Sequence, residues 1–288
     1  MIKIINTIQQ IDLIFENKLF NFDKWKEYIN SIYENSAHIF TDDIKEYFNS
    51  KSFSFEKDFL PIINNVYKNQ SLEILDNSFC KVTDKLNEKI EKHFNNKINI
   101  DIVLYVGLCN GAGWVTNIND KDVILLGIEK ILELNWQDIN SMTGLIYHEL
   151  GHIFHNQHGN FNQTSESNSK NFVWQLFTEG IAMYFEQVLV NDRDFFHQNL
   201  NGWKDWCDNH IKQIAKDFND DLQTMNKLNQ RFFGDWVNYN GYSDVGYYLG
   251  TKFIYSLIEK YTFTQLINLS IDEVYNLYLF YTEKFYEK

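Results

Sequence analysis

The sequence predicts an α+β protein that is predominantly α-helical. Apolar residues recur three and four positions apart through most of residues 1–96, and again from residue 136 onward. The spacing changes to a strand-like alternation only in a short central stretch near residues 98–131. With 44% hydrophobic and 17% aromatic residues, the chain has the composition of a packed globular protein. We therefore expect a small sheet among many helices.

Two regions are expected along the chain. The first, residues 1–96, is expected to be helical, because residues 23–40 and 71–97 have apolar side chains at helical spacing. Pro61, the only proline, marks a break between these two segments. The second region, residues 97–288, is expected to carry the chemistry and to pack with the first as one compact unit.

The central stretch predicts two strands followed by two long helices. Residues 98–108 alternate, the glycine-rich segment 109–114 is a turn, and residues 121–131 form a second β-rich apolar run. Helical spacing returns at residues 136–157, with Asp138 or Ser141 able to cap the start. A polar loop at 159–170 then separates this helix from another at 171–190.

Composition and charge exclude several classes of partner. The formal net charge of −13 leaves no excess of Lys and Arg for binding phosphates or an anionic bilayer, so nucleic acid is not expected as a partner. Cys80, Cys109 and Cys207 are widely spaced and odd in number, which fits neither a disulfide framework nor a thiolate metal cage. The first residues alternate apolar with polar side chains, so we expect no secretory signal, and we find no apolar run long enough to span a membrane. These features together predict a cytoplasmic protein.

Two histidines and a glutamate interrupt the stretch LIYHELGHIF, residues 145–154, whose other positions carry no charge. His148 and His152 are four positions apart, so on an α-helix their side chains point the same way, one turn apart. Two imidazoles in this arrangement can hold one metal ion. Glu149 is turned about 100° away from His148, which keeps it off the metal but close to a metal-bound water. A metal site explains these groups better than chance does, because unpaired ionisable groups are costly to bury.

A third ligand has to come from elsewhere, and Glu179 in FTEGIAMY fits best by residue type and context. Unless it faces solvent, this mid-helix carboxylate needs a partner, and a metal ion compensates its charge directly. Zn²⁺ held by His148, His152 and Glu179 keeps a fourth position for water, whose pKa falls toward about 7. Glu149 would take the proton from that water as general base and pass it to a leaving amine. The predicted chemistry is hydrolysis of a carbonyl substrate.

These motifs resemble those of the gluzincin zinc metallopeptidases, in which HExxH on one helix is joined by a Glu on the following helix. The similarity is greatest over residues 123–190 and is nearest to predicted bacterial zinc-dependent proteases. Their second motif, EGxA, and a later GYxxG are matched here by Glu179, Gly180, Ala182, Gly246, Tyr247 and Gly250. The resemblance implies a zincin-like fold and a zinc-dependent peptidase that hydrolyses peptide or protein substrates.

The resemblance also implies how substrate is held. In this family a small sheet packs beside the active-site helix, and its edge strand binds an extended peptide by main-chain hydrogen bonds. Residues 122–130 would be that strand. A tyrosine is implied to steady the tetrahedral oxyanion, with Tyr247 as first choice and Tyr248 and Tyr242 behind it.

One position departs from the family pattern. Several gluzincins place an Asp four residues after the ligand Glu, where it orients a histidine, but that position is Met183 here. Glu186, two helical turns from Glu179, is a possible substitute. We favour the simpler interpretation that Glu186 is a solvated surface carboxylate.

Two further histidines provide alternatives. His158 stands ten residues after His148, the spacing of the third ligand in the metzincin motif HExxHxxGxxH. The required glycine position is His155, and no clear Met-turn follows, so Glu179 is preferred as third ligand. His155 is expected to lie in the core or beside the metal ligands.

A rival function belongs to a different class: a non-enzymatic helical interaction protein with a structural or degenerate zinc site. A fourth protein ligand, such as His155 or His158, would close the coordination sphere and favour this reading. In the turn at 109–114, Cys109 is expected to be a small buried side chain. Asn110 and the glycines beside it either shape a substrate subsite or simply form the turn.

Overall fold

The computed structural model describes residues 1–45, 54–234 and 237–286. They belong to two compact units, Met1–Ile146 and Tyr147–Lys288. The α+β, predominantly helical class predicted from the sequence is confirmed. Within the described residues, no helix is both long enough and apolar enough to pass through a membrane.

The boundary between the units lies inside a helix, α8 (Ile139–His158). The boundary expected at residues 96 and 97 falls within the first unit instead. The reason is that the N-terminal strand β1 (Lys3–Asn6) is paired along its length with β4 (Asp101–Tyr105), which lies beyond that boundary. Residues 1–96 therefore contribute a strand to the sheet as well as helices.

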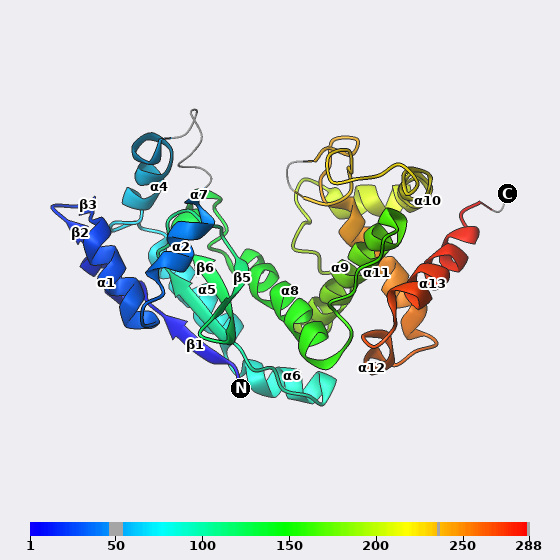
Figure 1. Ribbon diagram of the computed structural model, residues 1–288, viewed down its shortest axis with the longest axis horizontal. Coiled ribbons are helices and arrows are strands. Elements are labelled where there is room, and N and C mark those ends of the chain that lie inside the picture. The colour runs from blue at the N-terminus through cyan, green and yellow to red at the C-terminus, as the bar shows by residue number, and fades with distance from the viewer. Residues whose placement is uncertain (46–53, 235–236, 287–288) are drawn as a thin grey trace. The chain divides into compact units, whose positions relative to one another are not determined.

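A four-stranded mixed sheet with the order β1-β4-β6-β5 forms the centre of the first unit (Figure 1). β1 and β6 (Lys121–Gly127) run parallel to β4, whereas β5 (Trp114–Ile118) runs antiparallel to β6. The prediction that residues 122–130 form a strand at the edge of the sheet is thus wrong in two respects. β6 is an interior strand, whose main chain is already paired on both sides, and the chain becomes the helix α7 (Ile128–Glu133) after Gly127.

The edge strand β5 was not predicted, and a tight turn explains its position. Ile118 pairs with Lys121, so only Asn119 and Asp120 connect β5 to β6. Both residues have positive φ, 52° and 61°, as a two-residue hairpin turn requires, and Asn and Asp tolerate this conformation better than other non-glycine residues. The Asn-Asp pair folds β5 back onto β6 and leaves β5 at the edge.

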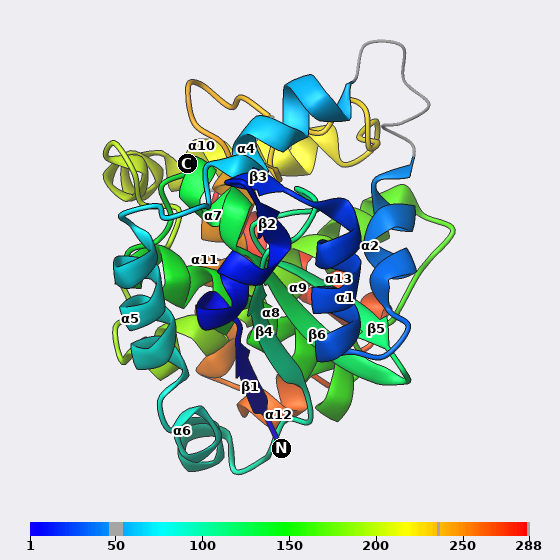
Figure 2. The ribbon, with the colours of Figure 1, turned by 90° about the vertical axis from the view of Figure 1, so that its left-hand side faces the viewer.

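Short helices and a small hairpin complete the first unit (Figure 2). Trp25 donates from Nε1 to the carbonyl of Val106 at 2.9 Å, which ties α1 (Phe22–Ile32) to the residue that follows β4. Pro61 lies in the first turn of α4 (Leu60–Asn64), where a proline is well tolerated because the N–H that it lacks would have no partner within the helix. The remaining elements are η1 (Ile8–Ile14), β2 (Phe15–Glu16), β3 (Leu19–Phe20), α1 (Phe22–Ile32), α2 (Ala37–Asp43), η2 (Phe55–Phe59), α4 (Leu60–Asn64), α5 (Leu72–Thr83) and α6 (Leu86–Phe94).

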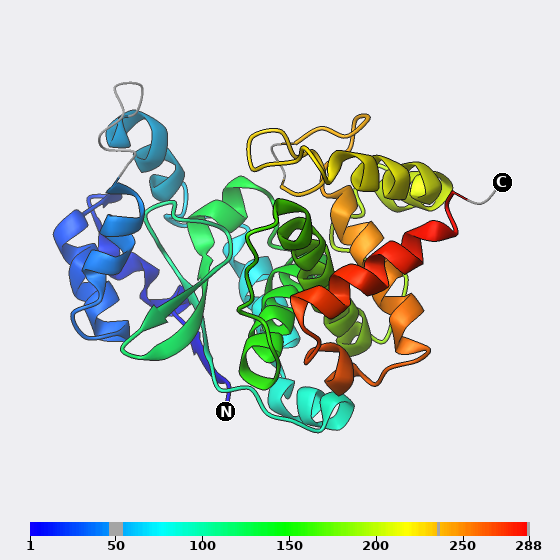
Figure 3. The ribbon, with the colours of Figure 1, turned by 45° about the vertical axis from the view of Figure 1, so that its right-hand side comes forward.

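In the described residues of the second unit, the last turns of α8 are followed by five further helices: α9 (Asn168–Val190), α10 (Trp203–Asp221), α11 (Val245–Ile258), α12 (Phe263–Leu266) and α13 (Ile271–Glu283). Most side chains of α9 are buried, and they lie on every face of the helix, which is typical of a helix inside a bundle. Figure 3 shows the orange α11 and the red α13 packed around the green α9. The carboxylates of α9 are therefore held in a low-polarity environment.

Two close approaches between helices depend on residues without bulky side chains. A Cβ added at Gly151 of α8 would lie 2.6 Å from Cα of Ala182 on α9. A Cβ added at Gly180 of α9 would lie 2.5 Å from the carbonyl oxygen of Gly250 on α11. α9 is thereby held between α8 and α11 with little space for displacement.

Candidate metal centre

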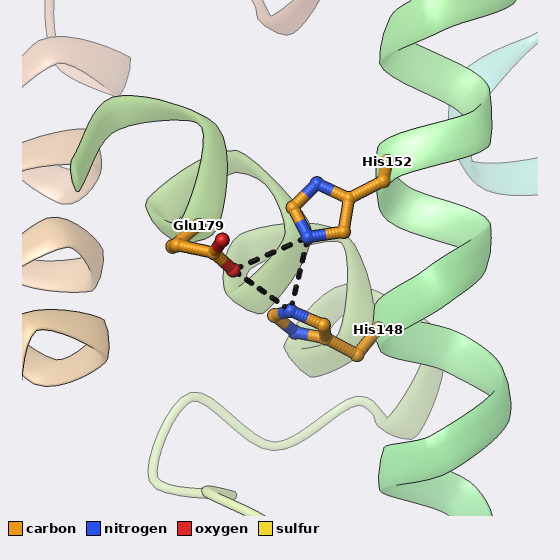
Figure 4. A group of neighbouring side chains, drawn as sticks. All are labelled: His148, His152 and Glu179. Carbon is orange, nitrogen blue, oxygen red and sulfur yellow. Dashed lines mark hydrogen bonds and ion pairs between the residues drawn. The ribbon is translucent and has the colours of Figure 1, made fainter. Parts of the chain in front are cut away.

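The two histidines of HExxH leave α8 on the same side and face Glu179 on α9 (Figure 4). Nε2 of His148 lies 3.1 Å from Oε2 of Glu179, and Nε2 of His152 lies 3.2 Å from the same oxygen. The two Nε2 atoms are 3.2 Å apart. The structure thus brings together the three residues that the sequence suggested as ligands, although they come from two helices.

This triangle of atoms fits a metal ion better than it fits hydrogen bonding. Three hydrogen bonds around such a triangle would need well-aligned protons on all its edges, which the angular preference of hydrogen bonds disfavours. Ligands about 2.0–2.1 Å from a tetrahedral zinc ion lie about 3.3 Å apart, close to the separations found here. His148, His152 and Glu179 could therefore hold one metal ion, with two nitrogen ligands and one oxygen ligand.

The small residues of the second motif explain how Glu179 comes to this position. Gly180 allows α9 to approach α11, and Ala182 allows it to approach Gly151 of α8. Gly250, the last residue of the GYxxG match, receives Gly180 on the other helix. The glycines and alanine of these motifs thus act through packing, and the packing sets the separation between Glu179 and the histidines.

The electrostatics of the metal-free group are those of a buried ion pair. Burial on its own lowers the pKa of His148, but a hydrogen bond to Glu179 and the negative charges of Glu179 and Glu186 raise it to about 10. Burial raises the pKa of Glu179, but the neighbouring His152 and His148 bring it below its usual range. A metal ion bound here would replace a proton on the imidazoles, because histidine binds metals in its deprotonated form.

Tyr247 of α11 is the tyrosine that lies at this site. Its ring centroid is 5.4 Å from that of His148. Burial, together with a hydrogen bond to Glu179 and the negative charges of Glu179, Asp244 and Glu149, raises the pKa of Tyr247 well above its usual value. At neutral pH its hydroxyl is therefore a hydrogen-bond donor.

The other two tyrosines point elsewhere. The hydroxyl of Tyr248 donates to Asp208 on α10, and the ring of Tyr242 packs against Trp206 of the same helix, with centroids 4.8 Å apart. Glu149 is half-buried on α8. The charge of Glu149 is one of those that raise the pKa of Tyr247.

Glu186 is fully buried, so the interpretation of a solvated surface carboxylate is wrong. Its Oε2 lies 3.6 Å from Nδ1 of His148. It also accepts a hydrogen bond at 2.9 Å from Nδ1 of His197, a loop residue that the sequence analysis did not single out. Burial raises the pKa of Glu186, but His197 and His148 lower it below its usual value. The side chain of Met183, where some gluzincins carry an Asp, is buried against Gln198.

The two alternative histidines occupy other environments. His155 is fully buried, and its Nε2 bonds the carbonyl oxygen of Ile267 at 3.1 Å, which requires the proton to be on Nε2. The ring of His158 packs on Phe154, with centroids 4.6 Å apart. In the described part of the chain, no candidate ligand group includes His155 or His158. Neither residue therefore supplies the fourth ligand that would favour the non-enzymatic interaction protein as the function.

The turn at 109–114 is held by side chains of the first unit. Nδ2 of Asn110 donates to the main-chain carbonyl of Phe40 and to the carboxylate of Asp43, at 2.9 Å each. The buried carboxylate of Glu129 accepts the main-chain N–H groups of Gly107 and Cys109 at 2.9 and 3.0 Å. Burial raises the pKa of the Cys109 thiol, as expected for a small buried side chain without reactivity. These contacts explain Asn110 as part of the turn.

Comparison with known proteins adds no relative from which a function could be transferred: no protein family, curated protein or solved structure matches the chain.

Proposed function

We propose that this protein is a zinc-dependent peptidase with a zincin-like fold. The observation that carries the proposal is the convergence of Nε2 of His148, Nε2 of His152 and Oε2 of Glu179, which all lie within 3.2 Å of one another. Two imidazoles and one carboxylate are the donor set of one well-known class of catalytic zinc site. The half-buried Glu149 beside His148 supplies the acid–base group that such hydrolysis needs.

The residues around the centre divide the work of hydrolysis. A zinc ion held by the three ligands would act as a Lewis acid and lower the pKa of water toward about 7. The carboxylate of Glu149 takes a proton from the attacking water and delivers it to the nitrogen of the leaving amine. The hydroxyl of Tyr247 donates a hydrogen bond to the oxygen that becomes negative in the tetrahedral intermediate.

A cavity beside Tyr247 offers space for part of the substrate. It has a volume of about 480 Å³ and is lined by aromatic, amide and charged side chains: Phe172, Gln175, Lys227, Gln230, Phe233, Gly234, Asp244 and Tyr247. Gln175 is one helical turn before the ligand Glu179 on α9, so this cavity adjoins the centre. Aromatic rings and side-chain amides together suit a peptide, which presents both apolar side chains and main-chain hydrogen-bonding groups.

The variant Glu149→Gln tests the mechanism. It keeps the size of the side chain but cannot take up a proton, so we expect one zinc ion per chain to remain and hydrolysis to fall about 10²- to 10⁴-fold. The assay measures cleavage of unfolded casein and of a mixed set of fluorogenic peptides. Glu166→Gln, which removes the same charge from an exposed loop, is the matched control and should keep full activity. Equal turnover by Glu149→Gln and wild type would exclude Glu149 as the base.

A further inference from the structure

Glu186 lies at the meeting point of α8, α9 and the loop that precedes α10. Its side chain is completely buried. Both of its carboxylate oxygens accept from Nδ1 of His197, at 2.9 and 3.1 Å, and Oε2 also lies 3.6 Å from Nδ1 of His148. A buried carboxylate between two imidazoles is an arrangement in which each side chain restricts the others.

The ring of His148 needs such a partner. Its Nδ1 is buried and makes no hydrogen bond with any described residue at ordinary hydrogen-bond distance. When a histidine binds a metal through Nε2, the proton stays on Nδ1, and an acceptor for that proton fixes both the tautomer and the ring orientation. The Glu186 carboxylate faces this atom at ion-pair distance.

His197 is held firmly enough to keep Glu186 in place. The loop that carries it is tied to α9 by the side chain of Gln187, which donates to the carbonyl of Phe195 at 2.8 Å. The ring of His197 also packs edge-on against that of His148, with centroids 5.2 Å apart. Its side chain is 24% exposed, so replacing it disturbs the core less than replacing Glu186 does.

We propose that Glu186 and His197 form a positioning pair for His148. When Nε2 of His148 holds a metal ion, Glu186 would accept the Nδ1 proton of His148, and His197 holds Glu186 in the orientation that makes this possible. The inference rests on the proposed function, since it assumes that Nε2 of His148 binds a metal ion. It assigns to His197, a loop residue outside both motifs, an influence on metal affinity without contact with the metal.

The same three residues form a second group with metal-ligand atoms within 4.8 Å of one another. Chemistry favours positioning over a second metal ion. His148 would have to bind one ion through each ring nitrogen and so lose both ring protons, whereas a neutral ring needs only the acceptor that Glu186 provides.

Zinc affinity of the full-length protein tests the pair. His197→Phe keeps a ring but removes the donor, and we expect about 10- to 100-fold weaker zinc binding. His197→Asn places an amide N–H near the position of Nδ1 and should restore affinity to within about threefold of wild type. His210→Phe is the matched control, because His210 is a half-buried imidazole stacked on Trp206 of α10, and it should bind zinc as wild type does.

Two additional readouts separate positioning from loss of structure. Urea unfolding of the metal-free proteins should give similar stability for wild type and His197→Phe. The visible spectrum of the cobalt-substituted protein should change in His197→Phe and recover in His197→Asn.

If wild type binds one zinc ion and His197→Phe and Glu186→Gln bind it equally well, the positioning pair is wrong while the proposed function stands. Two zinc ions per wild-type chain, with one lost in His197→Phe, would also overturn the pair. If wild type binds no zinc at all, the proposed function itself fails.

Discussion

Replacing Gly180 by alanine tests whether the second motif acts through helix packing. The new Cβ would lie 2.5 Å from the carbonyl oxygen of Gly250, about 0.9 Å closer than ordinary van der Waals contact allows. Backbone atoms cannot rotate aside, and Ala182 meets Gly151 on α8, so α9 has no free direction in which to move. Overpacking of this kind costs about 1–3 kcal/mol, and we expect the upper part of that range.

Helix propensity acts in the opposite direction, because alanine is favoured over glycine in a helix interior by about 1 kcal/mol. We therefore expect a net loss of about 1–2 kcal/mol in the unfolding free energy of Gly180→Ala. Zinc affinity should fall as well, since Glu179 is the adjacent residue. Urea unfolding of the metal-free protein and a competition titration with a zinc chelator measure the two effects.

A loop glycine serves as control for this experiment. A Cβ at Gly111 would meet its nearest neighbour at 3.6 Å, an ordinary contact, so Gly111→Ala should change stability by no more than about 0.5 kcal/mol. If Gly180→Ala proves more stable than wild type by the amount that helix propensity alone supplies, and binds zinc normally, the packing argument is wrong.

Three other predictions concern stability. Burial, with the nearby His152, lowers the pKa of His155 to about 3. The unfolded chain thus binds more protons between pH 6.5 and 3, so metal-free wild type should lose about 2 kcal/mol between pH 7 and 5 from this group. Urea unfolding at both pH values should show a smaller loss of unfolding free energy in His155→Asn. The control His93→Asn, at an exposed position, should show the same loss as wild type. Trp25→Phe leaves the carbonyl of Val106 without its indole donor and should cost about 1–3 kcal/mol in thermal or urea unfolding. Adding zinc at 100 times its dissociation constant should stabilise wild type by about 2.7 kcal/mol, and calorimetry should find this gain absent in His152→Ala.

Local periodicity was sufficient to predict the parts of the site that lie on single helices. The spacing of His148 and His152 determines that they share a face of α8, and the apolar surroundings of Glu179 indicated that its carboxylate is buried. The same reasoning misjudged Glu186, because a helical pattern does not reveal that α9 is covered on all sides. His197 lies in an irregular loop, so no periodic pattern in the sequence indicates that it contacts Glu186.

Long-range pairing explains what was missed in the sheet. β1 has only four residues, and its strand conformation depends on β4, which lies far along the chain. β5 could have been found from the Asn-Asp pair at residues 119 and 120, whose two-residue turn is a hairpin signal. The zincin-like fold, the peptidase activity and the cytoplasmic location stay predictions.

The most direct test of the central claim is the metal content of the purified protein, measured with zinc X-ray absorption after dialysis against trace-metal-free buffer. We predict one zinc ion per chain, a first shell of nitrogen and oxygen without sulfur, and loss of the ion in the double variant His148→Asn, His152→Asn. A wild-type chain with native circular dichroism that takes up no zinc, or a double variant that retains it, would contradict the account.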